Sequence, residues 1–142
     1  MESLYEKYKV EGIVSLSSNY VNNYIIPKNP DVVFIDVRPK EERSVSMLPN
    51  AKTIDDLNKN KEAYKNKTLI FYCTLGIRSA HVAKEFKEQD FKAFNLKYGV
   101  LGWAHENRPF ERNGISTNEV HTYSDKWNAL PEDYIYRSSI NK

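Results

Sequence analysis

The sequence predicts an α/β domain with a mainly parallel central sheet, and three observations lead to this fold class. Short, continuously apolar runs, such as residues 32–35 and 68–72, are typical of strands buried on both faces of a parallel sheet. Segments with apolar residues at helical spacing, such as 16–26 and 78–91, alternate with these runs. The length of 142 residues suits one domain with one hydrophobic core.

The strongest strand signal is the sequence Thr-Leu-Ile-Phe-Tyr at residues 68–72, which runs directly into Cys73. Residues 32–35 predict a second strand, and residues 93–96 predict the strand that follows the longest helix. Residues 51–54 are a candidate for a further short strand. Because helical segments separate these strands, parallel pairing is expected.

The first expected helix covers residues 16–26, with Ser15 or Ser17 as its N-cap. Pro27 and Pro30 are expected to end it and to begin a turn. The other expected helical segments are a turn at residues 39–43, a helix through Tyr64 capped by Asp55 or Asp56, an amphipathic helix at residues 78–91, and a segment at residues 101–105.

The charge pattern argues against a polyanionic partner. The net charge is +2, from 21 basic and 19 acidic residues, and the two signs are interleaved. The densest lysine cluster, residues 59–67, is diluted by asparagine and glutamate. A footprint for nucleic acid or a membrane surface needs a more one-sided patch, so we expect neither partner.

Cys73 is the only cysteine, which excludes an intramolecular disulfide framework and a cysteine-cluster metal site. Residues 1–10 carry acidic side chains and lack the apolar core of a secretory signal. The apolar runs are too short to span a bilayer. We therefore expect a cytoplasmic, reducing location, which suits a free thiol, and we expect neither a metal nor another cofactor.

The last segment, residues 113–142, lacks clear periodicity but is too aromatic for a typical disordered tail. We expect it to pack on the domain formed by residues 1–112, or on a second copy of the chain. Its large apolar and aromatic side chains are Tyr123, Trp127, Leu130, Tyr134, Tyr136 and Ile140.

The most informative segment is residues 73–78, called the cysteine loop below. It follows the carboxyl end of the strongest predicted strand and leads into a helix, and ligands of open α/β sheets bind at that edge. A short loop that curls into a helix N-terminus points its backbone N–H groups inward as a cradle for an anion. Gly76 permits the tight curl, and Arg78 adds a cation at the rim.

Such a cradle favours a nucleophilic cysteine. Helix N-termini and nearby cations lower thiol pKa values from about 8.5 to roughly 3.5–7.5, and the thiolate is the reactive form. A lone cysteine at a strand end is more often a small buried hydrophobe. A core cysteine, however, needs neither Gly76 nor Arg78 at these offsets, so the loop as a whole favours a catalytic role for Cys73.

Three further motifs accompany the cysteine loop, and together they resemble the rhodanese family over roughly residues 14–110. Met47 stands where this family often has histidine, and Asn50 where it often has glycine. The motifs are the D-x-R segment at residues 34–38 followed by Glu41 and Glu42, a segment similar to "HIPGA" at residues 46–51, and a glycine-rich turn before tryptophan at residues 98–104 with Pro109 beyond it.

The resemblance implies a three-layer rhodanese-like domain and a sulfurtransferase that carries sulfane sulfur as a persulfide on Cys73. The implied donor is a small anion such as thiosulfate, and the implied acceptor is cyanide or a thiol, including a protein thiol. Residues expected to bind the donor are Thr74, Leu75, Gly76, Ile77, Arg78 and Arg38.

Several residues near these motifs have competing interpretations. Asp36 is expected to be structural at its strand end, and Arg38 to pair with Asp36 or Glu42 or, alternatively, to face the cradle and attract anions. Trp103 is expected in the core. The isolated histidines predict no metal site; they are His81, His105 and His121.

Two other functional classes remain open from the sequence. The apolar cysteine loop and the aromatic C-terminal segment also suit a persulfide carrier or regulatory module in a protein sulfur relay. A cysteine phosphatase or arsenate reductase would share a similar fold. Phosphatases, however, place an arginine six residues after the cysteine, where this chain has Ser79, so we expect no phosphatase activity.

Overall fold

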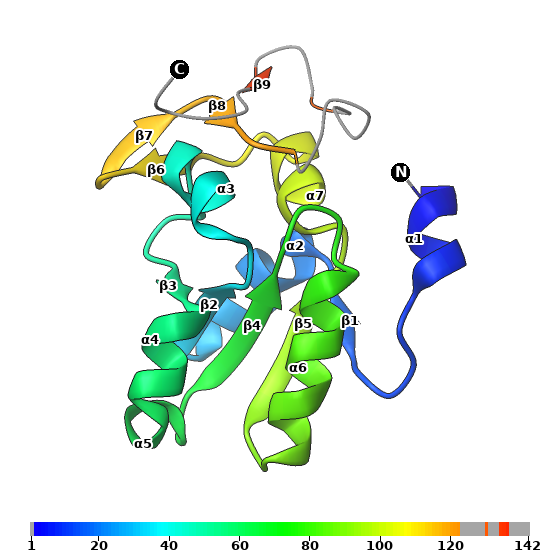
Figure 1. Ribbon diagram of the computed structural model, residues 1–142, viewed down its shortest axis with the longest axis vertical. Coiled ribbons are helices and arrows are strands. Elements are labelled where there is room, and N and C mark those ends of the chain that lie inside the picture. Colours follow the sequence, from blue (N-terminus) through cyan, green and yellow to red (C-terminus); the bar gives the residue numbers. More distant parts are fainter. Residues whose placement is uncertain (1, 123–129, 131–133, 137–142) are drawn as a thin grey trace.

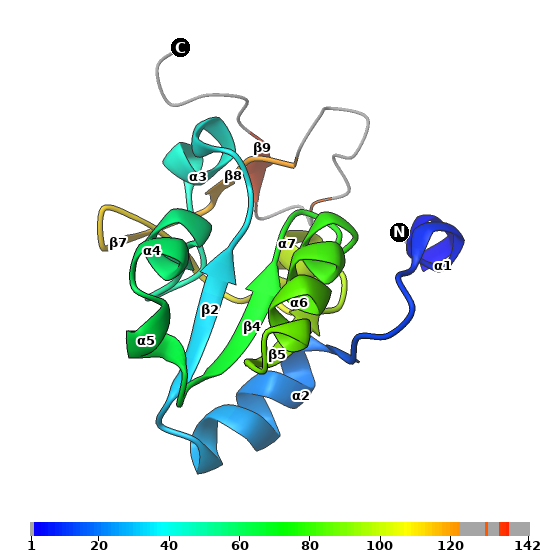
Figure 2. The same ribbon diagram turned by 60° about the horizontal axis from the view of Figure 1, so that its bottom comes forward.

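The computed structural model describes residues 2–122, 130 and 134–136. Its centre is a five-stranded sheet with the order β1-β5-β4-β2-β3 (Figures 1 and 2). All four strand pairs in this sheet are parallel, as the sequence predicts. The strands are β1 (Ser15–Leu16), β2 (Val32–Asp36), β3 (Lys52–Thr53), β4 (Thr68–Tyr72) and β5 (Lys92–Leu96).

Helices cover both faces of this sheet, which gives the three layers (Figure 2). One face carries α4 (Ile54–Lys59), α5 (Lys61–Tyr64) and α6 (Arg78–Glu88). The other carries α2 (Ser18–Tyr20), its continuation η1 (Val21–Ile25) and η2 (Ile26–Lys28), and α7 (Gly99–His105). The remaining elements are α1 (Glu2–Tyr8), α3 (Lys40–Val45), an antiparallel pair of β6 (Phe110–Arg112) and β7 (Ile115–Thr117), and a parallel pair of β8 (Glu119–Val120) and β9 (Ile135–Tyr136).

Strand β4 is buried on both faces and anchors two hydrophobic clusters. Leu69 and Phe71 pack with the cluster under α4–α6, whereas Ile70 and Tyr72 pack with the cluster under α7. Alternate side chains of a strand point to opposite faces, so a continuously apolar strand needs cover on both sides. The predicted bounds of this strand are confirmed, and those of β2 and β5 differ by one residue.

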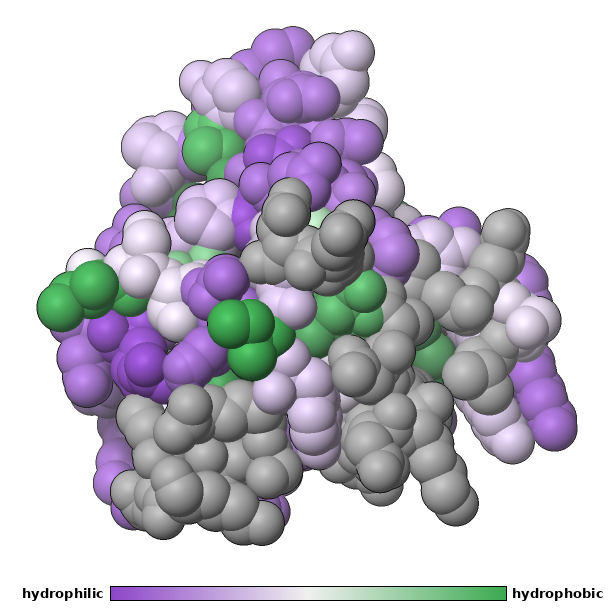
Figure 3. Space-filling view, turned by 90° about the horizontal axis from the view of Figure 1, so that it is seen from above, coloured by the Kyte–Doolittle hydropathy of each residue, from purple (hydrophilic) through white to green (hydrophobic). Residues whose placement is uncertain are grey.

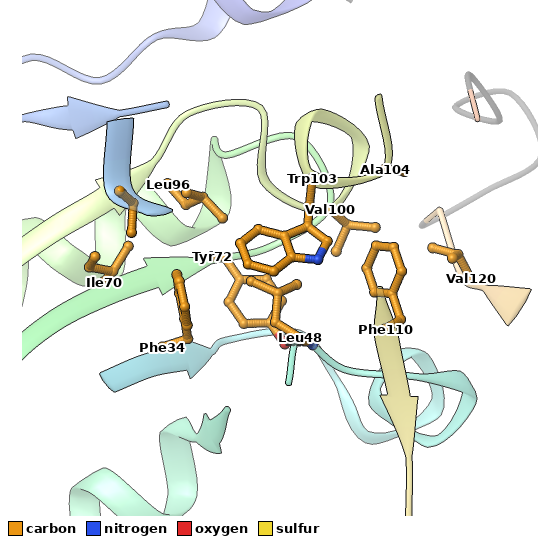
Figure 4. Packing of buried hydrophobic residues seen from close by; sticks show 11 residues of the cluster. Phe34, Leu48, Ile70, Tyr72, Leu96, Val100, Trp103, Ala104, Phe110 and Val120 are labelled. Carbon is orange, nitrogen blue, oxygen red and sulfur yellow. Dashed lines mark hydrogen bonds between the residues drawn. The ribbon is translucent and has the colours of Figure 1, made fainter. Parts of the chain in front are cut away.

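Trp103 of α7 lies in the core, as expected. Its ring packs edge-on against Phe34 with 5.4 Å between ring centroids, and its indole N–H donates to the carbonyl of Pro109 at 2.8 Å. Figure 4 shows the ring among Phe34, Leu48 and Tyr72. Truncating such a buried aromatic residue to alanine typically costs about 3–5 kcal/mol, so this contact fixes α7 firmly against the sheet.

The prediction of a first helix at residues 16–26 is wrong at its start, and the helix observed in the remainder of this segment is irregular. Leu16 belongs to a strand, because its carbonyl accepts the N–H of Lys97 at the edge of the sheet. Ser17 is the N-cap, and its hydroxyl accepts the N–H of Tyr20. The helix then widens to a π-turn at η1 and runs through Pro27 as a short 3-10 turn, rather than stopping before it.

Two other helix predictions also need correction. Thr53, not Asp55 or Asp56, caps α4, because its hydroxyl accepts the N–H of Asp56 at 3.0 Å. The expected helix through Tyr64 is divided at Asn60, whose backbone is non-helical.

Helix α6 ends at Glu88, before the predicted limit at Phe91. Asp90 adopts the left-handed conformation, with φ of 67°, so the chain turns there and the helix cannot continue. This turn places Phe91 in the core edge-on to Phe86, with 5.3 Å between the ring centroids.

Some of the described residues after position 113 pack against the rest of the domain. Val120 is fully buried in the cluster under α7. The hydroxyl of Tyr134 donates to the carbonyl of Arg108 at 2.7 Å, and its ring packs against Phe110. Tyr123, Trp127 and Ile140 lie outside the described residues. Along the described stretches of the chain, no helix is long and apolar enough to cross a membrane.

Candidate active site

The cysteine loop joins the carboxyl end of β4 to the first turn of α6, at the same edge of the sheet where β2 ends (Figure 1). Cys73 is 1% exposed. The N–H of Gly76 points at its sulfur from 3.2 Å, and the N–H of Ser79 from 3.5 Å. The predicted cradle is therefore present, with two backbone amides directed at the thiol. Backbone donors in this position stabilise negative charge on sulfur.

Gly76 is required for the shape of this loop. Its φ is +104°, a conformation that L side chains rarely adopt. A Cβ at this position would also lie 2.9 Å from the carbonyl oxygen of Leu96. Both strain and collision therefore explain the glycine that the sequence places three residues after Cys73.

Asn95 holds the loop from the neighbouring strand, and the sequence analysis did not identify it. This fully buried side chain accepts the hydroxyl of Ser79 at 2.6 Å and donates to the carbonyl of Gly76 at 2.9 Å. It also donates to the hydroxyl of Ser15 at 3.0 Å. One amide thus connects both residues whose backbone N–H groups face Cys73. The available signal was one polar residue within the otherwise apolar run of residues 93–96.

The N-terminus of α7 holds the other side of the loop. The N–H of Val100 donates to the carbonyl of Cys73 at 2.9 Å, and that of Leu101 to the carbonyl of Thr74 at 3.1 Å. The first N–H groups of a helix lack partners within the helix, and here the loop supplies them. The loop carbonyls are thereby directed away from the sulfur, while its amides are directed towards it.

Arg78 lies at the rim and is paired with an acid. Its guanidinium forms a two-pronged ion pair with Glu42 of α3, at 3.2 Å and 3.1 Å, and also donates to the hydroxyl of Thr74 at 3.2 Å. The Arg78 side chain is 35% exposed, whereas that of Glu42 is 4% exposed. The single formal cation of the loop is therefore held beside a nearly buried negative charge.

Arg38 pairs with Asp36, one of its two expected partners, rather than with Glu42. The guanidinium donates to Asp36 at 2.7 Å and to the carbonyl of Ser46 at 2.6 Å, and the side chain is fully buried. Burial lowers the pKa of Arg38, but Asp36 outweighs this effect and holds the pKa above its ordinary value. The hydroxyl of Tyr72 also donates to Asp36, and burial raises the pKa of Tyr72.

The remaining predicted donor-binding residues belong to the cysteine loop itself. Thr74 and Leu75 are buried, and Ile77 is half-buried.

His121, which the sequence analysis took as isolated, is 7% exposed. Burial lowers its pKa, and the charges of Glu42 and Arg38 also act on it. His121 therefore lies on the same side of the domain as the cysteine loop.

Figure 3 shows the domain from above, on the side where the strands of the central sheet end. The described surface there is mostly hydrophilic, with separated apolar groups. Within the described residues, no group of three His, Cys, Asp or Glu side chains is placed to hold a metal ion.

Fold and site together define an α/β domain with a cysteine held by backbone amides at a parallel sheet edge. The family model described as "Rhodanese-like domain" matches residues 19–106, and the chain belongs to this family. It is 36% identical over 87 residues to the putative sulfurtransferase YtwF of Bacillus subtilis, a match that covers 59% of this chain and 84% of that protein.

A second group of relatives shares only this domain. The chain is 31% identical over 109 residues to the tRNA uridine(34) hydroxylase of Buchnera aphidicola from Schizaphis graminum, covering 70% of this chain and 34% of that protein. The chain thus spans about a third of the length of this larger relative.

Solved structures show the same fold. A rhodanese-like domain protein from Staphylococcus aureus superposes with a TM-score of 0.60 at 29% identity, covering 71% of this chain and 99% of that one. The polysulfide-sulfur transferase of Wolinella succinogenes superposes with a TM-score of 0.61 at 23% identity, covering 79% of this chain and 89% of that one.

Proposed function

We propose that this protein is a sulfurtransferase that moves sulfane sulfur through a persulfide on Cys73, with thiosulfate as its simplest donor. The Cys73 thiolate attacks the outer sulfur of thiosulfate, a new S–S bond forms, and the old S–S bond breaks with its electron pair leaving as sulfite. Cyanide or a thiolate then attacks the terminal sulfur and forms thiocyanate or a new persulfide. The electron pair of the broken bond returns to Cys73, as expected for covalent catalysis in two half-reactions.

One observation carries this proposal: the amides of Gly76 and Ser79 converge on the sulfur of Cys73. The same donors can stabilise the thiolate before attack and the terminal sulfur after it, and they need no reorganisation in between. Thr74, Leu75 and Ile77 complete the proposed binding wall, and Arg78 stands at its rim. The expected contact of Arg38 with the donor is not part of this proposal, because its guanidinium is fully buried against Asp36.

Residues 113–142 are proposed to be an extension that packs on the domain of residues 1–112. The burial of Val120 and the contact of Tyr134 with Phe110 support this proposal. A role as a carrier in a protein sulfur relay uses the same persulfide and differs only in the identity of donor and acceptor.

The test is mass spectrometry of the intact protein after exposure to a sulfane-sulfur donor. The native chain should gain one sulfur atom, and cyanide should remove it with formation of thiocyanate. Cys73→Ser should gain none. A persulfide absent from the native protein with every donor, or transferase activity retained in Cys73→Ala, would refute the proposal.

A further inference from the structure

Among the described residues, Glu42 forms a direct ion pair with Arg78 at the cysteine loop. Its carboxylate is nearly buried, accepts both terminal guanidinium nitrogens of Arg78, and lies 3.3 Å from the hydroxyl of Thr74, the residue after Cys73. A carboxylate with little access to water is weakly screened. Because Thr74 directly follows Cys73 and Arg78 ends the same loop, this negative charge lies beside the loop that a donor must reach.

The second arginine near the loop is neutralised in the same way. Arg38 is fully buried against Asp36, so each of these guanidinium groups has a carboxylate in direct contact. The charges of Arg38, Asp36, Arg78 and Glu42 sum to zero. When Cys73 ionises, this group of residues becomes net negative, and the amides of the cradle contribute only partial positive charge.

Sulfur donors differ in charge, so a site without net positive charge repels some of them more strongly than others. Thiosulfate is a dianion, so its encounter with a thiolate brings three negative charges together. A hydropersulfide R–S–SH is neutral in its protonated form, so the same encounter involves one negative charge. The Cys73 thiolate attacks its terminal sulfur, the S–S bond breaks, and the electron pair leaves on the thiolate R–S⁻, leaving Cys73–S–SH.

We propose that Glu42 sets the donor specificity of this site by disfavouring dianionic donors and thereby selecting the persulfide of a thiol. The inference rests on the proposed persulfide chemistry of Cys73 and names its donor class. The carboxylate does not react. It holds Arg78 and cancels the charge that a dianion would need at the moment of attack.

If Glu42 only supported the shape of the loop, its substitution would change the reaction rates of neutral and anionic reagents by the same factor. The discriminating measurement is therefore a ratio. Iodoacetamide is neutral and iodoacetate is a monoanion of similar size, and both alkylate Cys73 by the same displacement at carbon. The iodoacetate-to-iodoacetamide rate ratio reports the field at the sulfur, whether or not the protein transfers sulfur.

Glu42→Gln removes the charge and keeps the shape. We expect it to raise this ratio roughly threefold or more, as loss of one nearby charge in a partly screened site predicts. Glu41→Gln makes the same charge change at an exposed neighbour on α3 and should leave the ratio within about twofold of the native value. An unchanged ratio in Glu42→Gln, or an equal rise in Glu41→Gln, overturns the inference. Glu42→Ala provides a second neutral variant should Glu42→Gln fail to fold.

The donor arms compare thiosulfate with cysteine persulfide, whose ammonium and carboxylate charges cancel, and with persulfidated serum albumin. Because thiosulfate carries two negative charges, its kcat/KM should rise about tenfold in Glu42→Gln, while the cysteine persulfide value changes by less than about twofold. Faster native transfer from cysteine persulfide assigns a small-molecule source, and faster transfer from albumin assigns a protein source.

A native preference for thiosulfate over both persulfides would refute the donor class. Absence of a Cys73 persulfide with all three donors would instead refute the proposed function, and the alkylation ratio would still decide the role of Glu42.

Discussion

Gly99, the first residue of α7, packs directly on the backbone of Cys73: a Cβ on Gly99 would lie 2.1 Å from the Cys73 carbonyl oxygen and 3.0 Å from that of Thr74. Gly99 also has a φ of +44°. This close approach lets the first amides of α7 reach the loop carbonyls. Gly99, the first glycine of the glycine-rich turn before Trp103, therefore shapes the cysteine loop and not the turn alone.

Gly99→Ala should distort the loop as well as destabilise the fold. We expect the free energy of unfolding to fall by about 2–4 kcal/mol, from overpacking and backbone strain together, and persulfide formation on Cys73 to slow. Gly114→Ala is the matched control, because Gly114 also has a positive φ but has open space around it, and it should cost only about 1 kcal/mol. Equal effects of the two substitutions in urea unfolding and persulfide formation would contradict this role.

Asn95→Leu should impair the reaction through the loop. The variant keeps the volume of the side chain but leaves the hydroxyl of Ser79 and the carbonyl of Gly76 without their buried partner. Each such unsatisfied group costs about 1–3 kcal/mol, so we expect a marked loss of stability and at least about a tenfold lower rate of Cys73 alkylation. Ser15→Ala removes only the third partner of Asn95 and should alkylate at the native rate. A native alkylation rate in Asn95→Leu would show that the loop holds its shape without this amide.

The side chain of Ser79 explains why phosphatase activity is not expected. Its hydroxyl is buried and donates to Asn95, so the position that carries arginine in cysteine phosphatases faces the protein interior. Without that arginine, the developing charge on a transferred phosphoryl group lacks its main counter-charge. Hydrolysis of p-nitrophenyl phosphate should stay at the background rate of the Cys73→Ser protein. Cys73-dependent phosphate release without persulfide formation would overturn the proposed function.

His121 should make the protein less stable in mild acid. Burial lowers its pKa, with Arg38 and Arg78 acting in the same direction and Glu42 and Glu41 opposing. The unfolded chain therefore takes up a proton at higher pH than the folded chain. The stability contributed by neutral His121 is present above about pH 6.5 and is lost as the pH falls through the lower folded value.

The measurement is the urea midpoint at pH 7.5 and pH 5.5. His121→Asn should show a smaller drop between these values than the native protein. His81→Asn, at an exposed position on α6, should show the native drop. Identical drops in all three proteins would mean that His121 does not titrate differently in the folded and unfolded states.

Local pattern was enough for the parts of the site that are contiguous in the chain. A continuously apolar strand, followed by Cys73, Gly76 and Arg78, predicts a loop that curls into a helix, because strand burial, glycine geometry and helix N-terminal amides all act within a few residues. The N-cap of α4 and the break at Asn60 were mispredicted, because several polar residues there compete for the same role.

The sequence by itself determined the parallel α/β architecture, the position of Cys73 at the end of a buried strand, and a loop that turns backbone amides towards it. Only the tertiary structure decided which distant residues complete the site: Glu42 lies 36 residues before Arg78, and Asn95 lies 16 residues after Ser79. Hydrophobic periodicity is a local property and predicts which face of an element is buried. The pairing of polar groups depends on which strands become neighbours, and β2, β4 and β5 bring these partners together only when the sheet is assembled.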